Sequence, residues 1–176
     1  MAELLLISGV PCTGKSLLGS YLADERGYIH IDAERDNGVD FDRTCIHREW
    51  DEFLGTGQGK IFVDAAARLG KPMVLNWGMP MNFLPIVPAL QAAGMGAWWL
   101  CADRALARIA FIEREKRKPE RERIPVECFH TQMDEIETHW PQIQEIFEKN
   151  MLQGLRPDGS QRPAEELWHE ISARSR

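Results

Sequence analysis

The chain has 176 residues, 44% of them hydrophobic, which is enough for one compact core and not for two. Its net charge of -6, from 21 Lys and Arg against 27 Asp and Glu, argues against a broad electrostatic surface for duplex nucleic acid. We therefore expect a single domain over residues 1–176 and do not expect nucleic acid as a partner.

The cysteines and the apolar runs indicate the cellular compartment of the protein. Cys12, Cys45, Cys101 and Cys128 are scattered and form no CxxC pair, unlike the cysteines of zinc sites or disulfide-rich secreted domains. No charged leader precedes an apolar segment, and the longest apolar runs are too short to cross a bilayer. These features predict a cytoplasmic protein with reduced thiols and no membrane association.

Short apolar runs alternate with amphipathic stretches along the chain. The runs that predict strands are residues 3–8, 28–31, 73–76, 97–101 and 151–155. The stretches that predict helices are residues 15–25, 60–69, 82–93, 104–118, 126–149 with a break near Pro141, and 164–173. This alternation is typical of right-handed crossover connections, a parallel sheet and helices on both of its faces. In such folds ligands bind at the carboxyl ends of the strands.

The segment from Gly9 to Ser16, GVPCTGKS, matches the phosphate-binding loop G-x-x-x-x-G-K-S (Walker A). It follows a predicted strand and opens a predicted helix, so a chance glycine-rich turn is the weaker interpretation. Its glycines allow a tight turn that points successive amide groups at a phosphate. Lys15 would reach the β- and γ-phosphates of ATP, and the Ser16 hydroxyl would bind Mg²⁺. The predicted ATP-binding residues here are Gly9, Val10, Pro11, Cys12, Thr13, Gly14, Lys15, Ser16 and Leu17.

Acidic residues follow the second predicted strand, whereas none stands at the end of the third predicted strand. The third strand ends in Asn76, Trp77 and Gly78, where a P-loop ATPase usually has a carboxylate, and no Asn-Lys-x-Asp motif supports GTP as ligand. Asp32 and Glu34 stand at the tip of the second strand. Asp32 is the catalytic candidate, either as the base for an attacking hydroxyl or as a holder of the magnesium shell. The structural alternative is a helix N-cap at Asp32.

From Arg108 to Arg123 the chain reads RIAFIEREKRKPERER, and charge replaces the apolar stripe of the helix. Arginine forks bind phosphate oxygens in pairs, and a mobile basic flap can close over ATP and exclude water. We expect a basic lid around residues 114–125, with Arg114 and Arg117 as the residues to test. A solvated helix end with Glu and Arg pairs is the alternative.

Residues 38–59 mix charged and aromatic side chains in a way that suits a small polar ligand. Arg43 and Arg48 could hold a carboxylate or phosphate of the phosphoryl acceptor. Alternatively, Trp50 and Phe53 pack a covering helix onto the sheet. The tip of the third strand is also placed to line a pocket. The predicted acceptor-binding residues are Asp32, Glu34, Arg43, Arg48, Asn76 and Trp77.

Together these motifs resemble the small P-loop kinases grouped with nucleoside monophosphate, shikimate and gluconate kinases. Asp32 with Glu34 is similar to the Asp-x-Asp pair that touches magnesium and substrate in shikimate kinases. Residues 114–119 (REKRKP) resemble the lid entrance, where one arginine lies against adenine and a basic residue beyond it reaches the phosphates. Residues 156–163 resemble the adenine-side loop. Asn76-Trp77-Gly78 departs from the Gly-Gly-Gly of shikimate kinases and the Asp-Gly of nucleotide kinases.

The resemblance implies a three-layer α/β P-loop fold, a five-stranded parallel sheet in the order 2-3-1-4-5, and an acceptor held between the lid and the segment after the second strand. The expected activity is ATP-dependent transfer of the γ-phosphoryl group to a hydroxyl or phosphate of a small metabolite, by a monomer or homodimer. Lys15, Asp32 and Arg117 would be catalytic, and Ser16 and Asp32 would hold Mg²⁺. The alternatives are a nucleic-acid end kinase or nucleotide-sugar kinase, and an ATP-sensing module with little turnover.

Overall fold

The computed structural model describes residues 3–34 and 39–175. Within them a parallel sheet of five strands has the order β2-β3-β1-β4-β5, which confirms the expected order. The strands are β1 Leu4–Gly9, β2 Ile29–Asp32, β3 Met73–Asn76, β4 Gly96–Cys101 and β5 Met151–Gln153. Because β1 lies between β3 and β4, the loop after β1 emerges at the middle of the carboxyl edge.

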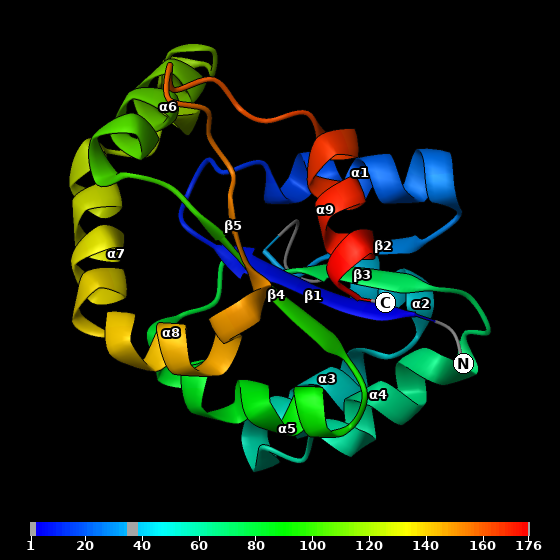
Figure 1. The fold of residues 1–176 in the computed structure, drawn as a ribbon. Coiled ribbons are helices and arrows are strands. Elements are labelled where there is room, and N and C mark those ends of the chain that lie inside the picture. Colours follow the sequence, from blue (N-terminus) through cyan, green and yellow to red (C-terminus); the bar gives the residue numbers. More distant parts are fainter. Residues whose placement is uncertain (1–2, 35–38, 176) are drawn as a thin grey trace.

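Helices cover both faces of the sheet and give three layers (Figure 1). On one face lie α1 Lys15–Arg26 and α9 Ala164–Arg174. Contacts to the sheet from the other face come from α4 Gly59–Arg68, α5 Val87–Ala92 and α8 Trp140–Phe147. The remaining helices are α2 Val39–Thr44, α3 His47–Thr56, α6 Arg104–Lys116 and α7 Val126–Thr138. Short 3₁₀ turns are η2 Met81–Ile86, η3 Glu120–Glu122 and η4 Glu148–Asn150.

The hydrophobic core has one part on each face of the sheet. All six residues of β1 are buried, as expected for a central parallel strand with both faces covered. Trp98 and Trp99 are neighbours in β4 and point to opposite faces, Trp98 toward the α1 and α9 side and Trp99 toward the other. Both indoles are at most 2% exposed, which confirms that they belong to the core. Burying a large apolar side chain contributes about 1.5–3 kcal/mol, so this core anchors the strand tips firmly.

Two helices, α2 and α3, form in the segment for which the sequence analysis offered a covering helix only as an alternative. Trp50 and Phe53 on α3 are 5% and 0% exposed, so the packing interpretation is correct for these two aromatics. Trp50 stacks on Phe41 of α2 at 5.1 Å and meets Phe62 of α4 at 5.0 Å between ring centroids. This aromatic cluster joins the three helices.

Prolines explain most differences between expected and observed helices. The break expected near Pro141 in the segment 126–149 is confirmed: α7 ends at Thr138, and α8 starts at Trp140 with Pro141 in its first turn, a position that proline tolerates. The expected helix over 82–93 begins as the 3₁₀ turn η2, because Pro85 cannot donate the hydrogen bond that an α-helix needs. Strand β5 ends at Gln153, two residues earlier than expected. Over the described ranges, no helix combines the length and the apolar character that a bilayer crossing requires.

Candidate active site

The phosphate-binding loop, or P-loop, runs from the end of β1 to the start of α1. Gly9 has a φ of +135°, and a Cβ there would lie 2.2 Å from the carbonyl oxygen of Leu100, so only glycine fits this close approach to β4. The Thr13 hydroxyl donates to the carbonyl of Val10 at 2.7 Å and closes the loop on itself. Gly14, with a φ of +92°, leads into the first turn of α1. The predicted loop therefore lies at the carboxyl edge, where its motif requires it.

The Lys15 ammonium lies inside this loop. It donates to the carbonyl oxygens of Gly9 at 3.0 Å and Val10 at 2.9 Å. Burial lowers the pKa of Lys15, and the negative charge of Glu34 opposes that shift more strongly than any other carboxylate. The cation is thus partly desolvated, which strengthens its attraction for a phosphate that enters the loop.

Ser16 and Asp32 meet beside the loop. The Ser16 hydroxyl donates to Asp32 Oδ2 at 3.0 Å, and Asp32 Oδ1 accepts the amide of Glu34 at 3.1 Å. The Asp32 amide in turn donates to Asp40 Oδ2 at 3.3 Å. Ala33 and Glu34 form a turn and not a helix, so Asp32 holds an Asx-type turn instead of the alternative N-cap. One carboxylate oxygen orders the strand end, while the other faces the P-loop.

The Ser16 and Asp32 oxygens fit Mg²⁺. This ion prefers oxygen ligands in octahedral geometry and usually keeps several waters, so it needs only one or two protein ligands. Among residues 3–34 and 39–175, no three His, Cys, Asp or Glu side chains gather into a metal cluster, which argues against a dedicated cage of protein ligands. The pair at 3.0 Å suits an ion shared with nucleotide phosphates.

Glu34 reaches the tip of β3. A Cβ on Gly78 would lie 2.3 Å and 2.5 Å from the two carboxylate oxygens of Glu34, so the acid rests directly on this glycine. The same carboxylate acts on the pKa of Lys15. The structure therefore brings Glu34, Lys15 and the third strand tip together, as the sequence analysis expected for a site at this edge.

Asn76 and Trp77 are packed inside the carboxyl edge. Asn76 is 2% exposed, and its Nδ2 lies 2.8 Å from His30 Nε2 on β2. A Cβ on Gly19 of α1 would lie 2.3 Å from the same His30 nitrogen, so these side chains fill the space between β2, β3 and α1. Trp77 is 6% exposed. Its ring packs on Trp50 at 4.8 Å and on Phe83 at 5.5 Å between centroids.

Arg43 and Arg48 lie on the surface of α2 and α3. The Arg43 side chain is 73% exposed and approaches Asp40 Oδ1 at 3.5 Å. Arg48 is exposed on the first turn of α3. The first residue of the expected acceptor segment, Gly38, lies outside the described residues. Both arginines remain predictions as acceptor-binding residues.

The expected lid, residues 114–125, starts in the last turn of α6 and continues through the 3₁₀ turn η3. Glu115 is 5% exposed, and its carboxylate binds Arg114 and Lys118, at 2.8 Å and 2.9 Å. Burial raises the pKa of the Cys12 thiol in the P-loop, and Arg114 opposes that rise more strongly than any other charge, with a smaller effect from Lys118. The charges of Arg114 and Lys118 therefore act on the electrostatic environment of the P-loop.

Arg117 is exposed, and its charge lowers the pKa of the exposed Glu113 on α6. The sequence analysis missed Glu115 and Lys118. The available signal was the short sequence separation of Glu115 and Lys118, an acid and a base three residues apart at the end of α6.

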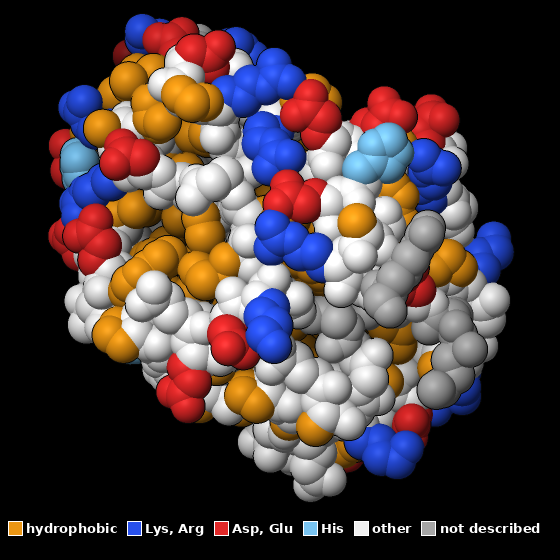
Figure 2. Space-filling model, viewed as in Figure 1, with side chains coloured by type: hydrophobic (Ala, Val, Ile, Leu, Met, Phe, Trp, Pro, Cys, Tyr) orange, Lys and Arg blue, Asp and Glu red, His pale blue; other side chains and the backbone are white. Residues whose placement is uncertain are grey.

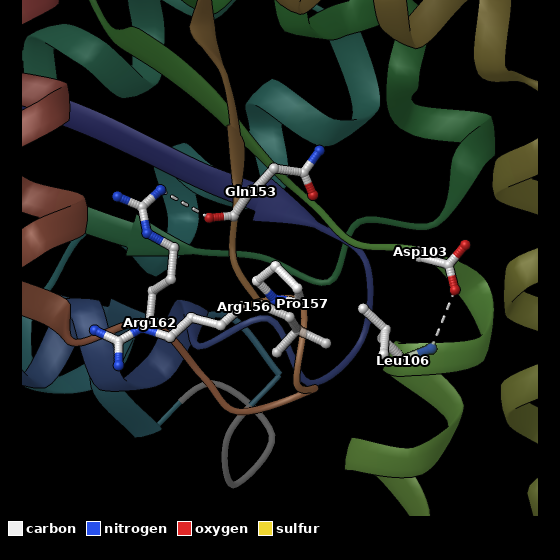
Figure 3. A pocket seen from close by; sticks show the side chains of 7 residues that line it. Asp103, Leu106, Gln153, Arg156, Pro157 and Arg162 are labelled. Atoms are coloured by element: carbon white, nitrogen blue, oxygen red, sulfur yellow. Dashed lines mark hydrogen bonds between the residues drawn. The ribbon is translucent and has the colours of Figure 1, made fainter.

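A pocket of about 450 Å³ lies beyond the carboxyl ends of β4 and β5. Its lining residues are Asp103, Leu106, Gln153, Leu155, Arg156, Pro157 and Arg162, most of them labelled in Figure 3. Arg156 binds Glu166 at 2.7 Å, and Arg162 binds Glu170 and the carbonyl of Gln153 at 3.0 Å and 3.1 Å. Because its cations are paired with these acceptors, the pocket offers mainly an apolar surface to a ligand.

This pocket is joined to the P-loop by the segment after β5. A Cβ on Gly154 would lie 2.5 Å from both Thr13 Cβ and the Thr13 carbonyl oxygen. Gln161 Nε2 donates to the carbonyl of Cys12 at 2.8 Å. A ligand with phosphates in the P-loop could therefore extend along this segment into the pocket.

A second pocket, of about 250 Å³, lies between the P-loop and α7. Its lining residues are Val10, Ala102, Arg104, Met133, Ile136, Glu137 and Trp140. Figure 2 shows hydrophobic side chains gathered on the α7 side of this face of the molecule. Arg104 binds Asp134 and Glu137 at 2.7 Å and 2.8 Å, so its charge is engaged within the protein.

Comparison of the sequence with protein-family models and with curated proteins finds no match. Solved structures with a similar fold include a gluconokinase from Sinorhizobium meliloti 1021, with a TM-score of 0.52, 16% identity, and coverage of 97% of this chain and 90% of that one. A shikimate kinase from Bacteroides thetaiotaomicron gives a TM-score of 0.59 at 11% identity and covers 98% of each chain. At these identities the likeness shows the fold alone, which this chain shares with both of these kinases. This confirms the three-layer α/β fold that the motifs implied.

Proposed function

We propose that this chain is an ATP-dependent phosphotransferase that moves the γ-phosphoryl group to a hydroxyl or phosphate of a small metabolite. The observation that carries the proposal is the hydrogen bond from Ser16 to Asp32 at 3.0 Å, beside the Lys15 ammonium in the P-loop. A phosphate cradle, a hydroxyl ligand for Mg²⁺ and a carboxylate thus meet at one edge of the sheet. Phosphoryl transfer depends on positioning and on charge stabilisation, and these groups supply both.

Each group has a separate role in the transfer. Lys15 and the P-loop amides bind the β- and γ-phosphates and stabilise charge that moves toward the leaving oxygen. Ser16 and Asp32 would hold Mg²⁺, which neutralises phosphate charge when bound. Where the acceptor is a hydroxyl, Asp32 also orients it and accepts its proton. Glu34, next to Lys15, would contact the acceptor from the β3 side.

The pocket beyond β4 and β5 supports ATP as the donor. Its apolar lining and paired arginines suit an uncharged flat ring, and Gly154 and Gln161 tie it to the P-loop. Adenine in this pocket would leave the γ-phosphate at Lys15. The lid would bring the positive charge of Arg114, Arg117 and Lys118 over the phosphates and exclude water.

The test is a metabolite panel screened for phosphorylated product with ATP and Mg²⁺. We expect Lys15→Ala to abolish turnover and Asp32→Asn to lower kcat by about 10²–10⁴-fold, the usual worth of a positioned acid or base, with ATP binding kept. Asp42→Asn is the control, because Asp42 is a 69% exposed acid on α2 that binds His47. This variant should transfer phosphate at the normal rate.

The outcome of the screen separates the alternatives. Tight ATP binding without product from any acceptor would support a nucleotide-sensing module and contradict the proposal. Product formed only from an oligonucleotide end, with acceptor binding that falls steeply as salt rises, would indicate a nucleic-acid end kinase. If Asp32→Asn turns over as fast as the wild type, Asp32 is not needed for the transfer, and its proposed role is wrong even if a product is found.

A further inference from the structure

The lid contains an acid that is almost completely buried. Glu115 is 5% exposed, although a charged side chain loses several kcal/mol of hydration on burial unless partners replace the water. Its Oε1 accepts from Arg114 Nε at 2.9 Å and Arg114 Nη2 at 2.8 Å, and from Lys118 Nζ at 2.9 Å. Its Oε2 accepts the backbone amide of Ile124 at 2.8 Å. Two cations and one amide therefore compensate the buried carboxylate.

These contacts hold the two ends of the lid together. Ile124 lies nine residues after Glu115, so its amide brings the far end of the lid back to the end of α6. Arg123 donates to the carbonyls of Lys118 at 3.1 Å and Lys116 at 3.5 Å and covers the end of the helix. Burial disfavours the charge of Glu115, but the bonds from Ile124, Lys118 and Arg114 outweigh it and hold the pKa of this acid below its ordinary value. The carboxylate is therefore ionised at neutral pH.

The two cations bound by Glu115 act electrostatically on the P-loop. The positive charges of Arg114 and Lys118 lower the pKa of the Cys12 thiol, and the negative charge of Glu115 raises it, so the whole ion-pair group influences this loop residue. An arginine has five N–H donors and a lysine three, and Glu115 engages two and one of these. Both cations can thus remain bound to Glu115 while they donate to phosphate oxygens. Arg114 is also fixed by the ring of Phe111, 5.0 Å from its guanidinium.

We propose that Glu115 is a positioning residue for phosphoryl transfer, which fixes Arg114 and Lys118 at the P-loop so that both meet the phosphates of the nucleotide. The inference rests on the proposed function. Long basic side chains lose much rotamer freedom when they bind a phosphate, and an acid that has already ordered them reduces that loss. Glu115 thereby acts through its two partners and touches no substrate itself.

The experiment compares binding of ATP and of adenosine to the full-length protein by isothermal titration calorimetry. In Glu115→Gln the side chain keeps its shape and can still accept from Ile124, but it loses the charge that orders both cations. We expect ATP to bind about tenfold more weakly, the usual scale for losing a hydrogen bond to a charged group, while adenosine affinity stays the same. Glu113→Gln is the matched control, since Glu113 lies on the same helix and forms an exposed pair with Lys116 at 2.7 Å.

A double-mutant cycle tests whether Glu115 works through its partners. In an Arg114→Ala/Lys118→Ala background, Glu115→Gln should weaken ATP binding no further, because the groups that it positions are gone. Glu115→Asp keeps the charge on a shorter stem and should show a smaller loss that is again specific to ATP. This second variant keeps the test decisive if Glu115→Gln does not fold.

Three results would overturn the proposal. Equal weakening of ATP and adenosine would mean that Glu115 only stabilises the fold, and unchanged ATP binding would mean that the cations need no positioning. Tighter ATP binding in Glu115→Gln would mean that the carboxylate competes with the phosphates. Because these readouts are binding constants, they do not depend on turnover: a protein that binds ATP without transferring phosphate contradicts the proposed function and leaves this test intact.

Discussion

At the scale of single residues, one glycine sets the position of an acid in the candidate active site. Gly78 lies under the Glu34 carboxylate, and a methyl group there would approach its three carboxyl atoms to 2.3–2.6 Å. These atoms are the end of a flexible side chain, so the acid would swing away while the backbone stays. Gly78 follows β3, where P-loop ATPases usually carry a carboxylate, and it makes room for the Glu34 carboxylate that follows β2.

We predict that Gly78→Ala changes catalysis more than stability. The displaced Glu34 leaves Lys15 and the acceptor region, so kinetic constants should shift in the same direction as in Glu34→Gln. The free energy of unfolding in urea should change by no more than about 1 kcal/mol, because no backbone atom is in the way. Gly55→Ala is the control, since a Cβ at Gly55 on α3 would meet nothing within 4 Å. Normal kinetics in Gly78→Ala would show that Glu34 has no part in the reaction.

Neighbouring residues of the candidate site could be predicted where each one belongs to a short sequence pattern at the end of a strand. The P-loop motif and the acid after β2 follow directly from a strand and its end, so the contact between Ser16 and Asp32 could be expected. The burial of Asn76 and Trp77 could not be expected from the sequence, because it depends on His30 and Trp50, which are distant in sequence. Among charged residues, the sequence shows a basic stretch but not which side of it turns inward.

At the scale of elements, the segment after β5 is packed against the P-loop with no space between them. Gly154 follows β5 directly, and its missing side chain lets the chain approach Thr13. Gln161 then binds the loop carbonyl of Cys12. The P-loop is therefore supported from the β4 and β5 side by a segment that also lines the larger pocket.

We predict that Gly154→Ala weakens both the fold and ATP binding. The added methyl would lie 2.5 Å from a backbone oxygen of the P-loop, so the segment or the loop must move. Overpacking of this kind typically costs about 1–3 kcal/mol, measurable by urea denaturation. Gly59→Ala is a matched control, because its methyl would lie 2.2 Å from the Ala89 carbonyl between α4 and α5. It should lose similar stability and keep its ATP affinity; equal ATP losses in the two variants would contradict the argument.

Elements were predictable where the apolar pattern was strong. The five strands and the helices α1, α4, α6 and α9 follow from that pattern, with ends shifted by up to two residues. Helix α2 was missed and α3 was expected only as an alternative, because Phe41 and Trp50 are held by aromatic contacts with each other and with α4 and not by a long periodic stripe. Their stability comes from the assembled fold.

At the scale of the whole molecule, the P-loop separates two sides of the carboxyl edge. The pocket beyond the carboxyl ends of β4 and β5 lies on one side, and Asp32 and Glu34 lie on the β2 and β3 side. The charges of Arg114 and Lys118 act on the pKa of Cys12 in the P-loop itself. This arrangement would let the donor nucleotide and the acceptor approach the γ-phosphate from opposite sides, as direct transfer between two substrates requires.

Binding across several elements should make the whole fold more stable when ATP and Mg²⁺ are present. A ligand at 100 times its dissociation constant stabilises the native state by about 2.7 kcal/mol. For a domain of this size each kcal/mol raises Tm by about 2–4 °C, so we predict a shift of about 5–11 °C by differential scanning fluorimetry. Chelation of Mg²⁺ with EDTA should reduce the shift, because Ser16 and Asp32 then share no ion with the phosphates. Lys15→Ala should abolish it, and an unchanged shift in that variant would place ATP outside the P-loop.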